Sequence, residues 1–308
     1  MSRPAVLETS LETAAGATET WRTRFADYRE LGKPGIAFMV AVTAAVGALA
    51  AGAGKTPFWY VVSVSLATVT LSAGAGALNH WLERDLDKRM KRTARRPLPA
   101  GRVAPAEAFF IGVALCVAGG TFLYLIAGLV PAGLGVLSAI LYLAVYTPMK
   151  RISVWNTFVG AFPGALPVLI GWTSIRTTLE PAAWLIFALL FVWQFPHFFA
   201  IAWLYREDYA AAGMRMFPST PLGERFTGVQ AIALCAVLLA ISVAPPLVAL
   251  GGPMYLIGAL ACGLYFLTYA VAFQRNPTNR RAKLLMASSL IYLASMMGLL
   301  LVTMAVRA

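Results

Sequence analysis

Residues 226–274 read FTGVQAIALCAVLLAISVAPPLVALGGPMYLIGALACGLYFLTYAVAFQ. These 49 residues include no Asp, Glu, Lys or Arg. One helical crossing of a bilayer takes about 20 residues, so a run of this length can cross twice. Residues 108–149 form a second uncharged run, of 42 residues. The two runs together predict four membrane-spanning helices.

The composition of the whole chain agrees with this reading. Of the 308 residues, 59% are hydrophobic and 12% are charged, and the mean hydropathy is +0.73. Soluble domains are about a quarter charged. The composition therefore excludes a soluble enzyme, a disordered chain and a disulfide-stapled secreted domain, and the lack of apolar–polar alternation argues against a β-barrel. The three cysteines lie in apolar runs without CxxC spacing, which is typical of buried hydrophobic residues and gives no metal site.

We expect an all-α polytopic membrane protein with nine transmembrane helices around a central cavity. Gly and Pro mark the breaks between the helices. A single membrane domain is expected at 35–305, between a tail at 1–34 and a short end at 306–308. Within the tail, residues 18–31 can form an amphipathic helix on the membrane surface. The predicted spans are 35–53, 58–80, 107–128, 131–148, 154–173, 183–204, 229–249, 253–273 and 284–305.

Positive charge gathers on one side of the expected membrane. With nine spans, 22 of the 25 Lys and Arg residues fall on the side of the N-terminus. Cytoplasmic loops carry the excess of Lys and Arg, so we expect the N-terminus in the cytoplasm and the C-terminus outside. This bias and contact with anionic lipid account for the net charge of +12 without nucleic acid as a partner. The short tail, with its five acids, favours a bacterial plasma membrane over a mitochondrial one.

The first of two acidic clusters follows the second span. Residues 79–99 read NHWLERDLDKRMKRTARRPLP. If the helix of the second span continues, Asn79, Glu83 and Asp87 share one face, because they are spaced i, i+4 and i+8. Mg²⁺ is commonly held by one or two carboxylates together with substrate phosphate. Metal and nearby guanidinium groups could hold a diphosphate here, although a solvated cytoplasmic loop explains the same charges.

The second cluster follows the sixth span, where Glu207 and Asp208 could hold a second Mg²⁺. His197 precedes Asp208 by 11 residues, or roughly 16 Å along a helix. A His at that depth is costly unless it faces the bundle interior or a cavity. It is either a satisfied interior side chain or a contact to haem iron or a haem propionate, and His80 is open to the same two readings. Lys150 and Arg151, on the same side, are either phosphate ligands or orientation charges.

Several segments are together similar to one family. Besides residues 79–99 they are LGKP at 31–34, YTPMKR at 146–151, Asn156 with PGALP at 163–167, PHF at 196–198 and REDY at 206–209. From about residue 28 to 305 the chain resembles the UbiA superfamily of intramembrane prenyltransferases. Within it, the chain looks like the branch that attaches a farnesyl group to protohaem IX. Many superfamily members carry two separated Asp in the second motif, whereas this chain has only Glu207 and Asp208, as the haem branch does.

The resemblance implies farnesyl diphosphate and haem B as substrates, haem O as product and Mg²⁺ as cofactor. It implies Asn79, Glu83, Asp87 and Asp208 as metal ligands, with Asp85 and Glu207 as helpers. It also implies Arg84, Lys91, Lys150 and Arg151 as diphosphate ligands, and His197 and His80 as haem contacts. Only the family suggests a haem A synthase or a terminal oxidase assembly factor as a partner.

Three other functions remain possible from the sequence. A sister transferase would use 4-hydroxybenzoate or chlorophyllide as acceptor, but His197 in place of an acidic second motif argues against it. A secondary transporter usually places ionisable groups near the middle of the bilayer, and here His197 alone would lie there. A non-catalytic membrane anchor would need no acidic clusters.

Overall fold

The computed structural model describes residues 21–53 and 55–307, and within them the chain is helical with no strand. Residues 18–20 of the predicted surface helix lie outside this range, and residues 21–31 are helical. That helix is held to the bundle where Tyr28 donates to Glu107 and Arg102 donates to Asp27 over 2.9 Å. Trp21 and Phe25 stay exposed on it.

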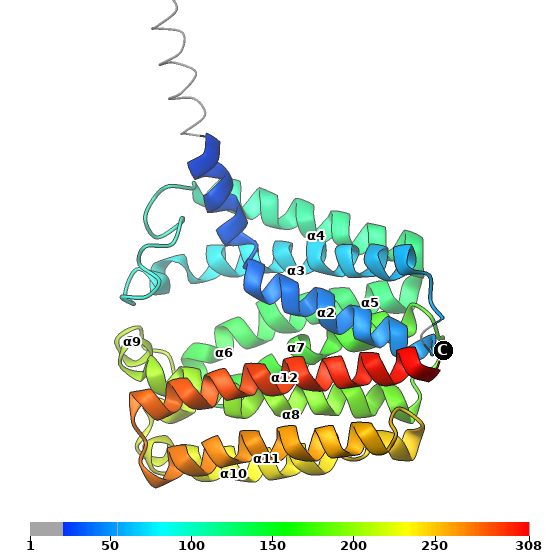
Figure 1. The fold of residues 1–308 in the computed structure, drawn as a ribbon. Helices are drawn as coiled ribbons and strands as arrows, with labels where there is room; N and C mark the ends of the chain where they lie inside the picture. The colour runs from blue at the N-terminus through cyan, green and yellow to red at the C-terminus, as the bar shows by residue number, and fades with distance from the viewer. Residues whose placement is uncertain (1–20, 54, 308) are drawn as a thin grey trace, which may run out of the picture.

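The bundle consists of long helices joined by short loops, which confirms the predicted all-α membrane fold (Figure 1). Many of the helices begin with Pro in the first turn, where its missing N–H costs nothing. A π-helical segment at Leu141–Tyr146 joins α5 to α6. The helices are α2 (Pro34–Ala51), α3 (Phe58–Asp87), α4 (Pro105–Ala127), α5 (Leu129–Ile140), α6 (Thr147–Ile152), α7 (Asn156–Thr173), α8 (Pro181–Leu204), α9 (Arg206–Ala211), α10 (Pro221–Ser242), α11 (Pro253–Arg275) and α12 (Asn279–Arg307).

Eight helices in the described residues are long and apolar enough to cross a membrane. The predicted fifth span is present as α7 but is not among the eight, so the count of nine stays a prediction. Gly and two Pro residues reduce the apolar content of this helix. Pro167 also leaves the carbonyl of Pro163 without its helical donor, and the Ser138 hydroxyl of α5 donates to that carbonyl over 3.2 Å.

α7 lies inside the bundle and packs against α2, α5 and α8. Its contact with α2 depends on two facing glycines. A Cβ on Gly47 would lie 2.0 Å from the Val168 carbonyl oxygen, and one on Gly171 would lie 1.9 Å from that of Ala44. Only glycine permits this close approach of the two backbones, which is the usual reason for small residues between membrane helices.

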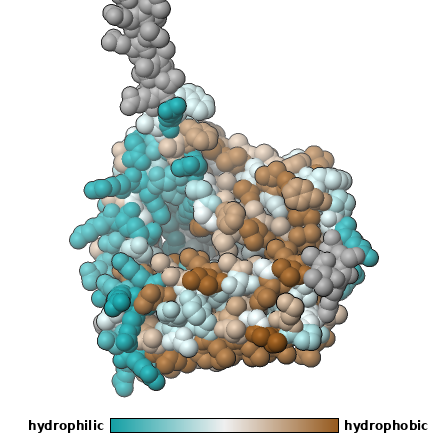
Figure 2. Space-filling view, in the orientation of Figure 1, coloured by the Kyte–Doolittle hydropathy of each residue, from teal (hydrophilic) through white to brown (hydrophobic). Residues whose placement is uncertain are grey.

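The two ends of the bundle differ in character. One end carries the loop between α3 and α4, together with α6 and α9, and hydrophilic residues gather there in Figure 2. The chain reaches the other end in the loops after α2, α7 and α10 and at its C-terminus (Figure 1). Both acidic clusters therefore lie at the same end, as predicted from the sequence.

Candidate active site

The last two turns of α3 form the base of the candidate site. Asn79, Glu83 and Asp87 lie on one buried face of this helix, with exposed fractions of 0%, 4% and 1%. Asp85 lies between them in sequence but points elsewhere, because its side chain is 68% exposed and pairs with Lys88. The i, i+4, i+8 spacing thus separates three buried polar residues from an exposed neighbour.

Each of the three buried residues contacts its own basic side chain. The Lys33 ammonium donates to Oδ1 of Asn79. Lys150 Nζ donates to Oε1 of Glu83 over 2.7 Å, and Arg96 Nη1 donates to Oδ2 of Asp87 over 2.8 Å. We call these six residues the paired ladder. A buried charge is tolerable only with such a partner, so the ladder holds its acids and bases in place together.

Three separate segments supply the bases. Lys33 precedes α2 in the left-handed backbone conformation, with φ 51°. Lys150 belongs to the short helix α6, and Arg96 to the turns that follow α3. Those turns fold back where the Thr93 hydroxyl donates to the Asp87 carbonyl oxygen over 2.9 Å. The site therefore depends on tertiary structure and not on one motif alone.

Two tyrosines of the π-helical segment lie beside the bases. The rings of Tyr142 and Tyr146 stack with centroids 5.7 Å apart. Lys33 Nζ donates to the Tyr142 hydroxyl over 2.8 Å, and Lys150 Nζ lies 4.6 Å from the Tyr146 ring centroid. π-Helical turns are often found at functional sites. Here the turn brings two aromatic faces to two ammonium groups.

The Lys33 ammonium is held in an unfavourable electrostatic setting. Burial first, and then the positive charge of Lys150, lower the pKa of Lys33 to about 7. An anion that entered the site would favour the charged form of Lys33. The site is thus rich in positive charge around its acids and suited to a polyanion.

The second acidic cluster lies on α9, close to the loop that follows α3. The Arg92 guanidinium lies 4.7 Å from the ring centroid of Tyr205, directly before α9. Met90 and Met214 form a buried apolar contact between the same two segments. Asp208 is half-buried, whereas the side chain of Glu207 is 90% exposed. The fold therefore brings the two motifs together, with Asp208 the less exposed of the two acids.

The residues present fit a hard cation such as Mg²⁺. Nowhere in the described residues do three His, Cys, Asp or Glu side chains form a group that could hold a metal. Mg²⁺ does not need such a group, because it keeps waters and takes phosphate oxygens beside one or two carboxylates. Oδ1 of Asp87 is buried and has no hydrogen-bond partner among the described residues. That oxygen, with those of Asn79 and Glu83, provides the ligand type that Mg²⁺ prefers.

Three of the residues predicted to hold diphosphate are not part of the paired ladder. Arg84 donates to the Trp81 carbonyl oxygen over 2.7 Å and covers the Trp81 ring. Lys91 and Arg151 are exposed. Lys33 and Arg96, which were not predicted to hold diphosphate, belong to the ladder instead. The sequence did not distinguish Arg96 from the other bases of its loop, and Lys33 is distant in sequence from both acidic clusters.

The two histidines have different surroundings. His197 Nδ1 lies 2.7 Å from the Ser289 hydroxyl of α12, and its ring stacks on Trp193. His80 follows Asn79 on α3, is 2% exposed, and its Nδ1 has no hydrogen-bond partner among the described residues. His197 thus has the contacts of an interior residue, whereas His80 lies beside the paired ladder with an unsatisfied nitrogen.

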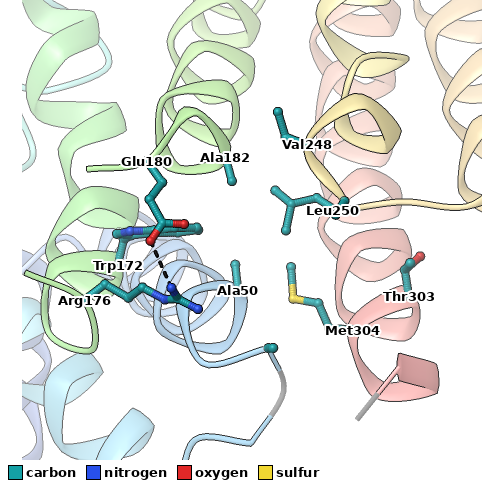
Figure 3. A pocket seen from close by; sticks show the side chains of 11 residues that line it. Ala50, Trp172, Arg176, Glu180, Ala182, Val248, Leu250, Thr303 and Met304 are labelled. Atoms are coloured by element: carbon teal, nitrogen blue, oxygen red, sulfur yellow. Dashed lines mark hydrogen bonds and ion pairs between the residues drawn. The ribbon is translucent and has the colours of Figure 1, made fainter. Parts of the chain in front are cut away.

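Two cavities lie apart from the predicted residues. One of about 600 Å³ is apolar and lies between α3, α4 and α5. The other, of about 170 Å³, lies at the opposite end of the bundle, where Arg176 pairs with Glu180 over 3.0 Å (Figure 3). Neither is lined by a residue of the paired ladder. The candidate site is therefore defined by its charges and not by the size of a pocket.

Comparison with known proteins places this arrangement in a family. Residues 40–297 match the UbiA prenyltransferase family. A protoheme IX farnesyltransferase of Solibacter usitatus is 44% identical over 73% of this chain and 77% of its own length. One of Opitutus terrae is 39% identical over 92% of this chain and 97% of its own length.

A solved structure agrees with these matches at the level of the fold. A UbiA homologue from Archaeoglobus fulgidus bound to GPP and Mg²⁺ superposes with a TM-score of 0.62 at 16% identity. The match covers 89% of this chain and 99% of that one. By its sequence and its helical bundle, the chain belongs to the UbiA family and is an integral membrane prenyltransferase.

Proposed function

We propose that the protein transfers a farnesyl group from farnesyl diphosphate to a vinyl group of protohaem IX, with addition of water, to give haem O and diphosphate. Mg²⁺ is the cofactor, and haem B is a substrate. Relatives that align over most of the chain carry the name protoheme IX farnesyltransferase, which supports haem as the acceptor. The solved homologue with GPP and Mg²⁺ supports a metal-bound prenyl diphosphate.

The observation that carries the proposal is the paired ladder. Its oxygen side, from Asn79, Glu83 and Asp87, suits Mg²⁺, and Asp208 adds a carboxylate from α9. Its basic side, from Lys33, Lys150 and Arg96, suits the diphosphate. A magnesium diphosphate carries both signs of charge, so it complements both halves of the ladder. Asp85 and Glu207, whose side chains are 68% and 90% exposed, keep the lesser role of helpers in this proposal.

The chain's own residues then favour departure of the diphosphate. The C1–O bond of farnesyl diphosphate breaks, and the bonding electrons leave with the diphosphate. Lys33, Lys150 and Arg96 stabilise the negative charge that develops on it. When bound, Mg²⁺ supplies further neutralisation of the same oxygens. The faces of Tyr142 and Tyr146 can stabilise positive charge at C1 through their ring quadrupoles.

The acceptor step forms one carbon–carbon bond. The terminal carbon of the haem vinyl group attacks C1 of the farnesyl group. Water adds to the remaining vinyl carbon and releases a proton, which gives the hydroxyethylfarnesyl side chain. His80, next to Asn79, and His197, deeper on α8, are the proposed haem contacts. The apolar farnesyl tail lies among the helices, which offer apolar side chains below the ladder.

We further propose that a single domain at 35–305 lies in a bacterial plasma membrane with the N-terminus in the cytoplasm. The site then faces the cytoplasm, because the paired ladder lies at the end that carries most of the Lys and Arg residues. The C-terminus lies on the other side. Haem O would pass to a haem A synthase or to the assembly of a terminal oxidase.

The test uses the purified protein in detergent with haem B, farnesyl diphosphate and Mg²⁺. Mass analysis of the haem should show the gain of one farnesyl group and one hydroxyl group. Parallel reactions offer 4-hydroxybenzoate or chlorophyllide in place of haem. Prenylation of either one, with haem unchanged, would reject haem as the acceptor while leaving prenyl transfer intact.

A further inference from the structure

Thr147 occupies a buried position behind Asn79. It is the first residue of α6, directly after the π-helical segment, and is 6% exposed. Asn79 Nδ2 donates to the Thr147 hydroxyl oxygen over 2.9 Å. The hydroxyl in turn donates to the Tyr142 carbonyl oxygen over 2.8 Å. Thr147 therefore links the candidate ligand Asn79 to the backbone of the π-helical segment.

The direction of these bonds fixes the amide of Asn79. A hydroxyl has one proton, and that of Thr147 is used on the Tyr142 carbonyl oxygen. The Thr147 oxygen can then only accept, so it contacts the amino group of Asn79 and not the carbonyl oxygen. Oδ1 of Asn79 is left on the opposite side, where it contacts Lys33. Rotation of the amide by 180° would place two acceptors in contact.

The π-helical segment supplies the carbonyl that orients Thr147. The Tyr142 carbonyl oxygen also accepts the backbone N–H of Thr147, five residues later. In a regular α-helix that N–H would bond four residues back, to Leu143. The wider turn thus aligns the backbone and the hydroxyl of Thr147 on one acceptor.

We infer that Thr147 is a positioning residue that holds the amide of Asn79 in the orientation that would leave its carbonyl oxygen available to a metal. The inference rests on the proposed function, which makes Asn79 a ligand of Mg²⁺. Groups that orient metal ligands typically change metal affinity 10–100-fold when removed. Thr147 is not itself proposed as a ligand of the metal or the diphosphate, and its effect would pass through its bond to Asn79.

The test measures Mn²⁺ binding to the purified protein with and without inorganic pyrophosphate, by the EPR signal of free Mn²⁺. Thr147→Val keeps the shape and removes the hydroxyl, and it should raise the Kd about 10–100-fold. Thr147→Ser should restore affinity to within about threefold of the wild type. Thr68→Val is the matched control, because Thr68 is buried on α3 and its hydroxyl donates to the Val64 carbonyl oxygen of its own helix.

A double-mutant cycle separates orientation from general damage. A carboxylate has two equivalent oxygens and no amino group, so Asn79→Asp has little need of orientation. In the Asn79→Asp background, Thr147→Val should therefore raise the Kd for Mn²⁺ much less than it does in the wild type. If Thr147→Val does not fold, Thr147→Ala removes the same hydroxyl with a smaller side chain.

Two results overturn the inference. The first is equal Mn²⁺ affinity in the wild type and in Thr147→Val. The second is a decrease in Mn²⁺ affinity on Thr147→Val that is as large in the Asn79→Asp background as in the wild type. A wild type that binds no Mn²⁺ and transfers no farnesyl group would instead count against the proposed function, so the two failures are distinguishable in one set of measurements.

Discussion

The pair between Lys150 and Glu83 offers the sharpest test of the candidate site. Lys150 Nζ and Glu83 Oε1 are 2.7 Å apart, and their side chains are only 11% and 6% exposed. Lys150→Met removes the cation and leaves a carboxylate buried without its partner. Breaking a buried pair on one side costs about 3–5 kcal/mol, because the remaining charge cannot regain water.

A double variant separates the structural cost from the chemical one. Glu83→Gln with Lys150→Met removes both charges, so it should recover most of the stability that Lys150→Met loses. It should nevertheless remain inactive, because it lacks both a metal ligand and a diphosphate ligand. Lys88→Met is the control, since Lys88 pairs with Asp85 over 3.3 Å at the exposed surface, where such pairs contribute about 0–1 kcal/mol.

The assay combines thermal unfolding in detergent with turnover of farnesyl diphosphate. The expected order of melting temperatures is wild type and Lys88→Met highest, then the double variant, then Lys150→Met. A Lys150→Met protein with the same melting temperature as the wild type would refute the buried pair. A double variant that regains turnover would refute the catalytic role of both residues.

Three further variants test individual residues. Asp87→Asn should reduce Mg²⁺-dependent turnover at least 100-fold, whereas Asp85→Asn should stay within about threefold of the wild type, because only Asp87 lies on the buried face. Equal turnover in the two variants would contradict the metal assignment. Asp208→Asn should reduce turnover more than Glu207→Gln, because Glu207 is almost fully exposed. Steady-state kinetics at varied Mg²⁺ would measure both losses, and a larger loss in Glu207→Gln would contradict the prediction. His197→Ala should raise the KM for haem more than that for farnesyl diphosphate, and an equal rise in both would leave His197 a purely structural partner of α12.

The sequence predicted the bundle well because apolar length is a strong local signal. The long uncharged runs became helices, and the Gly and Pro breaks fell at helix ends, as at Gly128 between α4 and α5. α7 was harder to recognise as a membrane span, because its Pro and Gly residues lower its mean hydropathy. Its packing against α2, α5 and α8 stabilises it all the same. Such stabilisation comes from neighbours that local composition does not reveal.

The sequence predicted the oxygen-bearing residues of the candidate site but not the bases that pair with them. The spacing of Asn79, Glu83 and Asp87 is a property of a single helix, so their shared face followed from periodicity. The pairing of their bases depends on three segments that meet only in the folded chain. One loop holds Arg96 among seven other basic residues, and nothing local indicates that it turns inward to Asp87.

The π-helical segment holds one residue more than an ordinary α-helix would need to connect α5 with α6. Each residue of a helix advances the chain by about 100° around the axis. Deletion of one residue, such as Ala144, would let the segment close into an ordinary α-helix, in which the Thr147 N–H would still bond to Tyr142, now four residues back. A second deletion would have no wide turn to absorb it, and it would turn Thr147 and Lys150 away from α3 together, with loss of their contacts to Asn79 and Glu83.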